Sequence, residues 1–223
     1  MKAPVRSSDA FAPVKISSAQ VADIVTEIRN DIVRGVIAPG APLGQEALAE
    51  RFGVSRMPIR EAIRHLETMG FVNVESNKRT HVAETSLNDF RDIYDMRLAL
   101  ECVAMRSAMA HLTNAQIDGA ERIQQDIAEA GPLSFGQLNH AFHMTLYRPC
   151  NRPRLLSQVD ILFNAADRYL CILKAPPGMR AKSDAEHIEL IEACRKRDSA
   201  AAEACLRRHI GDAAALFEEQ FAE

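Results

Sequence analysis

The segment Gly53–Gly70, GVSRMPIREAIRHLETMG, constrains the fold of this chain most. Its Gly-Val-Ser start predicts a tight turn into a helix, with Ser55 at the N-cap, where its hydroxyl is expected to accept from first-turn amides. Pro58 suits that first turn, and Gly70 predicts the end of the helix. Residues at helical spacing form an apolar stripe and a basic row beside it, namely Ile59, Ala62, Ile63 and Leu66, and Arg56, Arg60 and Arg64. Such a helix suits insertion into a DNA major groove.

The surrounding residues predict a winged helix-turn-helix. An apolar stripe over 18–35 predicts a first helix, which Gly35 closes, and QEALAERF over 45–52 predicts a second. FVNVE over 71–75 and THVA over 80–83 alternate like two strands around a polar turn at 76–79. Three helices followed by a small hairpin is the element order of that fold.

Beyond residue 83 no strand signal appears. Helical periodicity and breaks at glycine, proline and capping residues predict six helices, over 86–112, 113–130, 134–147, 153–173, 180–197 and from 198 to the C-terminus. The expected fold class is therefore mainly α, a winged helix-turn-helix followed by an antiparallel helical bundle. The expected division is a flexible N-terminus over 1–14, a DNA-binding domain over 15–83, a linker over 84–88, and an all-helical domain over 89–223.

Composition limits the class of protein only weakly. The net charge is −3, but 11 of the 27 basic and 9 of the 30 acidic residues precede residue 84, which leaves a slightly basic front half. No apolar run is long enough for a transmembrane helix, and residues 1–14 lack the apolar centre of a signal peptide. Five scattered cysteines without a C-x-x-C pair favour a reduced protein, so we expect a cytoplasmic location without membrane contact.

Segment 33–83 resembles the DNA-binding domain of the GntR family. The resemblance rests on G-x-I-x-P-G, the L-A-E helix, G-V-S-R-x-P-I-R-E-A and L-E-x-x-G-F before the hairpin. It implies that Arg56 and Arg60 contact bases or phosphates and that the wing enters the adjacent minor groove. Ser55 could touch a phosphate, and Arg64 could either bind DNA or pair with an acidic neighbour. The wing tip departs from the family pattern, because Asn77, Lys78 and Arg79 are followed by Thr80 and not by the usual glycine. The backbone path of the wing can therefore differ, and the two cations at its tip could hold phosphates instead of entering the minor groove.

Histidines in the predicted bundle offer a second candidate site. Asn139 and His143 are four residues apart on one helix face, and His187 and His209 lie in the last two helices. By spacing alone, these are either packed residues or metal ligands. The back half resembles the FCD effector domain of FadR-like GntR regulators through NHAFHMTLYRPCNRPRLL, AEHIELIEACRKRDSAAAEACLRRHI and MRLALE. The resemblance implies an Asp and three histidines around a divalent metal such as zinc, nickel or manganese. Asn139 replaces the aspartate, and an amide oxygen is a weaker ligand.

A metal in such a domain would be structural or would hold an effector. We expect a small carboxylate, with Arg97 or Arg168 as its cationic partner, although Arg97 could instead pair with Glu101. His140 should point elsewhere. The expected function is a ligand-responsive regulator, a repressor in the common case, that binds a palindromic operator as a homodimer. The alternatives are a metal-dependent enzyme, for which Glu186 is poorly placed as a base, and a regulator that senses acyl-CoA.

Overall fold

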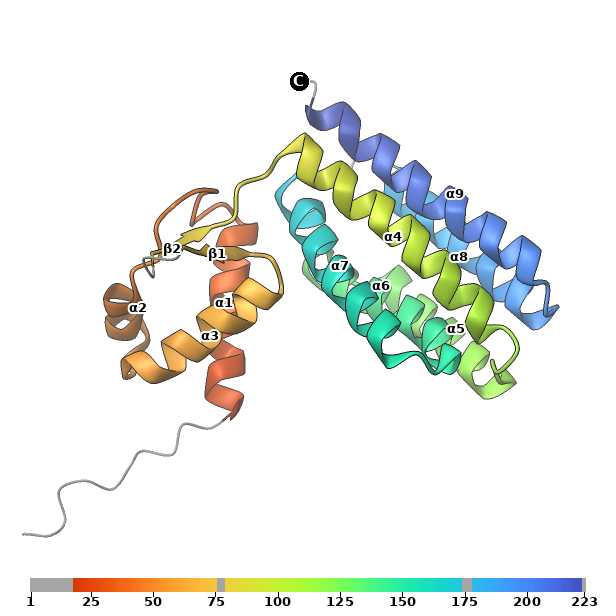
Figure 1. The fold of residues 1–223 in the computed structure, drawn as a ribbon, viewed down its shortest axis with the longest axis horizontal. Helices are drawn as coiled ribbons and strands as arrows, with labels where there is room; N and C mark the ends of the chain where they lie inside the picture. Colours follow the sequence, from red (N-terminus) through yellow and green to blue (C-terminus); the bar gives the residue numbers. More distant parts are fainter. Residues whose placement is uncertain (1–17, 76–78, 174–177, 222–223) are drawn as a thin grey trace, which may run out of the picture.

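The computed structural model describes residues 18–75, 79–173 and 178–221 and is mainly helical (Figure 1). The N-terminal part contains α1 (Ser18–Val33), α2 (Gln45–Phe52), α3 (Arg56–Thr68), β1 (Val72–Val74) and β2 (Thr80–Val82). The C-terminal part contains α4 (Leu87–Ala108), α5 (Asn114–Glu129), α6 (Pro132–Tyr147), α7 (Pro153–Ile172), α8 (Met179–Arg195) and α9 (Ser199–Glu218), with 3₁₀ turns at Arg148–Cys150 and Glu219–Phe221. The predicted fold class is confirmed. The predicted flexible segment 1–14 lies outside the described residues.

The turn between α2 and α3 forms as the glycine pattern predicts. Gly53 has a φ of 62° and ends α2 in the left-handed conformation, which costs glycine little. Gly70 does the same after α3, with a φ of 74°. Ser55 occupies the N-cap of α3 in an extended conformation, but its side chain makes no capping hydrogen bond, so that detail of the prediction was wrong. The exposed hydroxyl leaves the first-turn amides to solvent or to a ligand.

The hairpin is antiparallel and pairs Val72 with Val82 and Val74 with Thr80. The amide of Leu43 donates to the carbonyl of Thr80 at 2.8 Å, which fastens the segment before α2 to the hairpin. Arg79 is exposed at the start of the return strand. The predicted wing-tip residues Asn77 and Lys78 lie outside the described residues. The hairpin packs on α3 and shares its core, which contains Ile28, Ile59, Leu66, Phe71 and Val82.

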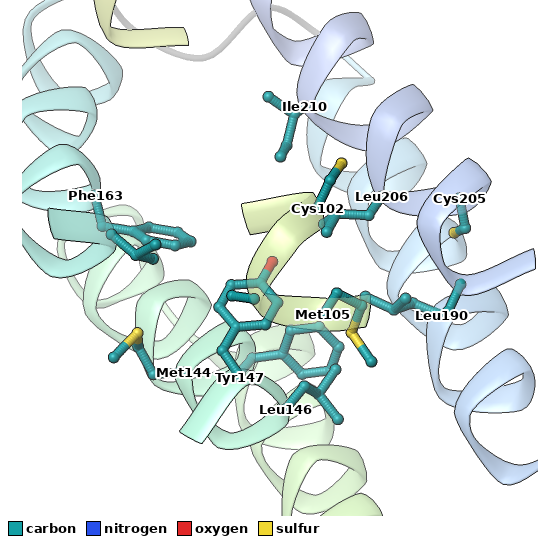
Figure 2. Packing of buried hydrophobic residues seen from close by; sticks show 14 of the residues in the cluster. Cys102, Met105, Met144, Leu146, Tyr147, Phe163, Leu190, Cys205, Leu206 and Ile210 are labelled. Carbon is teal, nitrogen blue, oxygen red and sulfur yellow. The ribbon is translucent and has the colours of Figure 1, made fainter. Parts of the chain in front are cut away.

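The C-terminal helices form a bundle in which the long α4 lies alongside α9 and α7 (Figure 1). Caps define the helix starts, since Thr113 and Gln116 form a capping box at α5 and Asp198 accepts from the amide of Ala201 at α9. Figure 2 shows the core between these helices, where Met105 of α4, Tyr147 of α6 and Leu190 of α8 are buried. This core is separate from that of the N-terminal part.

Arg168 of α7 joins the two parts of the molecule. Its guanidinium donates to the backbone carbonyl of Gly70 at the end of α3 and to the carboxylate of Asp89 in the first turn of α4, both at 2.6 Å. The hydroxyl of Tyr169 also lies 2.6 Å from the Asp89 carboxylate. Nearby, Arg29 of α1 pairs with Asp167 of α7. One helix of the bundle is thus bound directly to the C-terminal end of the predicted DNA-binding helix.

The Arg168→Met substitution is expected to lower the free energy of unfolding by about 1–3 kcal/mol, because it removes two charge-assisted hydrogen bonds from a buried side chain. Urea denaturation measures the change. The matched control is Arg91→Met, which removes the ion pair between Arg91 and Glu218. These two side chains are 51% and 36% exposed, so their pairing should contribute little to stability. Equal losses in the two variants would contradict a bridging role for Arg168.

Candidate DNA-binding surface and metal centre

The exposed face of α3 carries the predicted basic row. Arg56, Arg60 and Arg64 are all exposed, whereas Ile59 and Ala62 on the opposite face are fully buried. This division follows from the 3.6-residue period of the helix. Met57, 61% exposed, lies among the arginines. The predicted division of this helix into a core face and a solvent face is confirmed.

A groove of about 1140 Å³ runs between α3 and the hairpin. The arginines of α3 line one side, and Arg79 and His81 line the other. Acidic residues also reach it, and Glu46 of α2 forms an exposed ion pair with Arg56. Arg64 forms no ion pair with Glu61 or Glu67 within the described ranges, so the acidic partner considered for it is not found there. The groove thus presents several cations. Arg56 can contact a phosphate or a base only after it has left the carboxylate of Glu46.

The three predicted metal ligands of the bundle come together. His143 of α6, His187 of α8 and His209 of α9 are buried, and one ring nitrogen of each lies within 4.8 Å of the others. The ring centroids are 4.8–5.1 Å apart. Buried imidazole rings need hydrogen-bond partners or a shared cation for their nitrogens.

Each histidine has an outward partner on its Nδ1 atom. The Nδ1 of His143 lies 3.1 Å from the hydroxyl of Tyr147, and that of His209 lies 2.9 Å from a carboxylate oxygen of Glu186. The Nδ1 of His187 contacts the side-chain oxygen of Gln124. Metal-binding histidines commonly donate their second nitrogen to such a group, which fixes the orientation of the ring.

These partners also fix which nitrogen carries the proton. The Tyr147 hydroxyl donates to Glu101 at 2.8 Å, so it can only accept from His143. The Gln124 amide nitrogen donates to Asp184 at 2.8 Å, which turns its oxygen toward His187. The Glu186 carboxylate takes the hydrogen bond from the Nδ1 of His209 as an acceptor. Each ring thus donates from Nδ1, and in a neutral ring Nε2 then has a lone pair to offer.

Burial favours the neutral form of His143 and His187. It lowers the pKa of His143 well below the ordinary value, and the neighbouring His187 and His209 lower it further. Burial likewise lowers the pKa of His187, with His209 adding to the effect. Burial and then the Glu101 charge raise the pKa of Tyr147 well above its ordinary value, so its hydroxyl remains a neutral partner. Neutral imidazoles are the form that binds a metal, and no proton must first be displaced.

The donor set fits a divalent metal. Within the described part of the chain, the Nε2 atoms of His143 and His187 and the side-chain oxygen of Asn139 are buried without a hydrogen-bond partner. Unpaired buried polar atoms are costly, and a shared cation would satisfy all of them. Asn139 lies one turn before His143, as the sequence spacing predicts. The set of three imidazole nitrogens and one amide oxygen suits zinc or nickel more than magnesium or calcium.

A cavity of about 30 Å³ adjoins this cluster. Asn139, Glu186 and His209 line it together with Arg97 and Lys182. Arg97 donates to Glu101 at 2.8 Å, so the salt bridge considered from the sequence is present, and the same side chain still faces the cavity. A carboxylate bound in this cavity would meet the guanidinium of Arg97, whose charge Glu101 already partly neutralises.

Two other sequence predictions concern residues that lie outside this cavity. Arg168, predicted as an alternative effector contact, is not among its lining residues and binds Gly70 and Asp89 instead. His140 points away from the cluster toward Asp160, as expected, although it is half-buried rather than exposed. The sequence reasoning missed the outward partners Tyr147, Gln124 and Glu186. The position of Tyr147, four residues after His143, was a usable signal, whereas Gln124 and Glu186 act across helices.

An exposed basic helix beside a hairpin, joined to a helical bundle with a polar centre, defines a two-domain DNA-binding protein. Residues 20–82 match the family described as bacterial regulatory proteins, gntR family, and residues 92–212 match the FCD domain. The chain belongs to the GntR family of transcription regulators. Members bind operator DNA, and FCD domains bind small-molecule effectors. Among the described helices, none is both long and apolar enough to cross a membrane.

Known relatives agree with this assignment. The HTH-type transcriptional repressor RspR of Escherichia coli K12 is 31% identical over 190 residues, which cover 82% of each chain. The repressor GlaR of the same organism is 28% identical over 198 residues, which cover 82% of this chain and 89% of GlaR. The solved structure of E. coli McbR/YncC superposes with a TM-score of 0.74 over 91% of this chain and 98% of that chain. At 22% identity, that likeness shows the fold alone.

Proposed function

We propose that this regulator is a ligand-responsive repressor that binds a palindromic operator as a homodimer. The effector is a small carboxylate held beside a divalent metal, with zinc, nickel and manganese as candidates. The observation that carries the proposal is the cluster of three outward-anchored histidines beside a cavity that His209, Asn139 and Arg97 line. Because a regulator acts where the chromosome lies, we place its action in the cytoplasm.

The bound metal would supply a Lewis-acidic position for a carboxylate oxygen. His143, His187 and His209 would hold it through Nε2, with Asn139 as an oxygen donor. Tyr147, Gln124 and Glu186 keep the imidazole rings in place through their Nδ1 atoms. Lys182 is paired with Asp212 and Arg97 with Glu101, so the charge of the metal would add to that of Arg97 in attracting an anion.

Two helices connect this cavity to the DNA-binding part. Leu170 of α7 lines the cavity, two residues beyond Arg168, which binds the end of α3. Arg97 of α4 also lines it, and the first turn of the same helix carries Asp89, the other partner of Arg168. An effector that shifts α4 or α7 would change the position of α3, and hence the population of arrangements that can bind two operator half-sites.

The alternatives receive less support. GntR-family regulators are not enzymes, which argues against the metal-dependent enzyme. A cavity of about 30 Å³ beside charged groups is a poor match to a long acyl chain.

Fluorescence anisotropy with the DNA upstream of the protein's own gene tests the proposal. We expect a discrete, sequence-preferring complex at about 0.15 M salt, where purely electrostatic binding is weak. Its affinity should change only when a divalent metal and a carboxylate are both present. Absence of a sequence-preferring complex would contradict operator binding, and a complex that no carboxylate alters would contradict effector control.

A further inference from the structure

The cavity beside the histidines has a polar end and an apolar end. At the polar end, Arg97, Asn139, Glu186 and His209 lie beside the histidine cluster. Phe135, Met179 and Leu216 line the cavity further along α6, α8 and α9, and Leu170 of α7 lines it too. The apolar residue lies four positions from the polar one on α6 (Phe135 and Asn139) and seven positions from it on α8 and α9. These spacings correspond to roughly 6–10 Å along the bundle.

Contacts between the helices place the apolar residues at one end of the cavity. Glu186 contacts His209, and one turn further Lys182 pairs with Asp212 at 2.6 Å, so α8 and α9 run antiparallel past the cavity. The guanidinium of Arg180 lies over the ring of Phe135, which places Phe135 level with the start of α8. The end of α9 lies beside the start of α4 and the end of α7, as ring contacts of Phe90 with Phe217 and Tyr169 show.

The charges between the two ends are paired with each other. Lys182 and Asp212 form an ion pair whose side chains are 49% and 35% exposed, so this part of the cavity reaches the surface. A volume of about 30 Å³ takes a group of roughly carboxylate size. Leu170 and Leu216 line the same cavity and are only partly buried, so a longer ligand would have to displace their side chains toward the surface.

We infer that the effector is an amphipathic monocarboxylate, with its carboxylate at the polar end and a branched aliphatic or aromatic body at the apolar end. This inference rests on the proposed function and narrows it. Sugar acids and dicarboxylates are disfavoured as the preferred class, because hydroxyl or carboxylate groups that extend beyond Ser183, Lys182 and Asp212 would lie unpaired against Phe135, Met179 and Leu216. An apolar body there gains by leaving water.

The test is calorimetric titration of the full-length protein, with and without zinc, against five acids. Acetate supplies the head group alone, 4-methylpentanoate and 3-phenylpropanoate add an apolar body, and gluconate and succinate add polar groups. We expect the two apolar-bodied acids to bind at least about tenfold tighter than the other three. Tightest binding of gluconate or succinate would overturn this inference while leaving the effector site intact. Failure of all five acids to bind would overturn the effector part of the proposed function itself.

A matched pair of variants locates the apolar end. Leu216→Asn is expected to weaken binding of 4-methylpentanoate about tenfold and to leave acetate unchanged, because only the longer acid reaches this residue. The control is Ile188→Asn, which changes a side chain of α8 that is 53% exposed and does not line the cavity. Equal effects of the two variants, or equal losses for both acids, would contradict the placement of the apolar body.

Discussion

Replacement of Arg60 by alanine is expected to weaken the operator complex by at least about 100-fold. Arg60 is exposed on the groove side of α3 and forms no ion pair within the described ranges, so its guanidinium is available for DNA. A good bidentate contact to a base contributes about 1–3 kcal/mol, and a dimer loses it at both half-sites. Fluorescence anisotropy with the operator measures the loss, and the thermal melt should be nearly unchanged because no buried contact is removed.

The matched control is Arg34→Ala. Arg34 is also an exposed arginine of the N-terminal part, but it follows α1 and does not line the groove. Both substitutions remove one positive charge, so a purely electrostatic contribution would weaken binding equally in the two variants. Wild-type affinity in the Arg60 variant would show that α3 does not bind DNA through this residue.

Replacement of His187 by alanine is expected to reduce the bound divalent metal from about one ion per chain to nearly none. Loss of one of three imidazole ligands lowers the affinity steeply, because the remaining donors cannot complete the coordination. Elemental analysis after dialysis measures the content. In the wild-type protein, added zinc should raise the melting temperature, since a ligand of the native state stabilises it, and a chelator should reverse that change. The variant should show neither response.

His140→Ala is the control for this experiment. It removes a histidine from the same helix as His143, but its ring is directed at Asp160 and not at the cluster. Its metal content should equal that of the wild-type protein. If the wild-type protein binds no metal and its melting temperature is insensitive to zinc, the three histidines form a hydrogen-bonded core and not a metal site.

Local patterns made most of the fold predictable. Gly53, Gly70, Thr113 and Asp198 each mark a helix boundary through a conformation or a cap that only a few residues provide, and the structure places the boundaries there. The predicted capping hydrogen bond of Ser55 does not form, because a serine at this position indicates where the helix begins but does not determine the rotamer of its hydroxyl.

The candidate metal site was predictable only in part. The pair Asn139 and His143 follows from helical spacing, but the arrival of His187 and His209 at the same place rested on the family resemblance. The contacts of Gln124 with His187 and of Glu186 with His209 depend on how each helix is rotated about its axis. Hydrophobic periodicity gives that rotation too coarsely to pair individual polar side chains. For the same reason, the position of Arg168 at the junction with α3 could not be read from its place in α7.

The contact between Arg168 and Gly70 has a consequence for how this protein could evolve. Its acceptor is a backbone carbonyl, so no side chain of α3 takes part in it. The residues that face the groove, such as Arg56, Met57 and Arg60, can therefore be exchanged without altering the connection to the bundle. Under the proposed function, a lineage could acquire a new operator by surface substitutions on α3 and keep its response to the same effector. Conversely, a change in the cavity would then alter what is sensed without altering which DNA sequence is read.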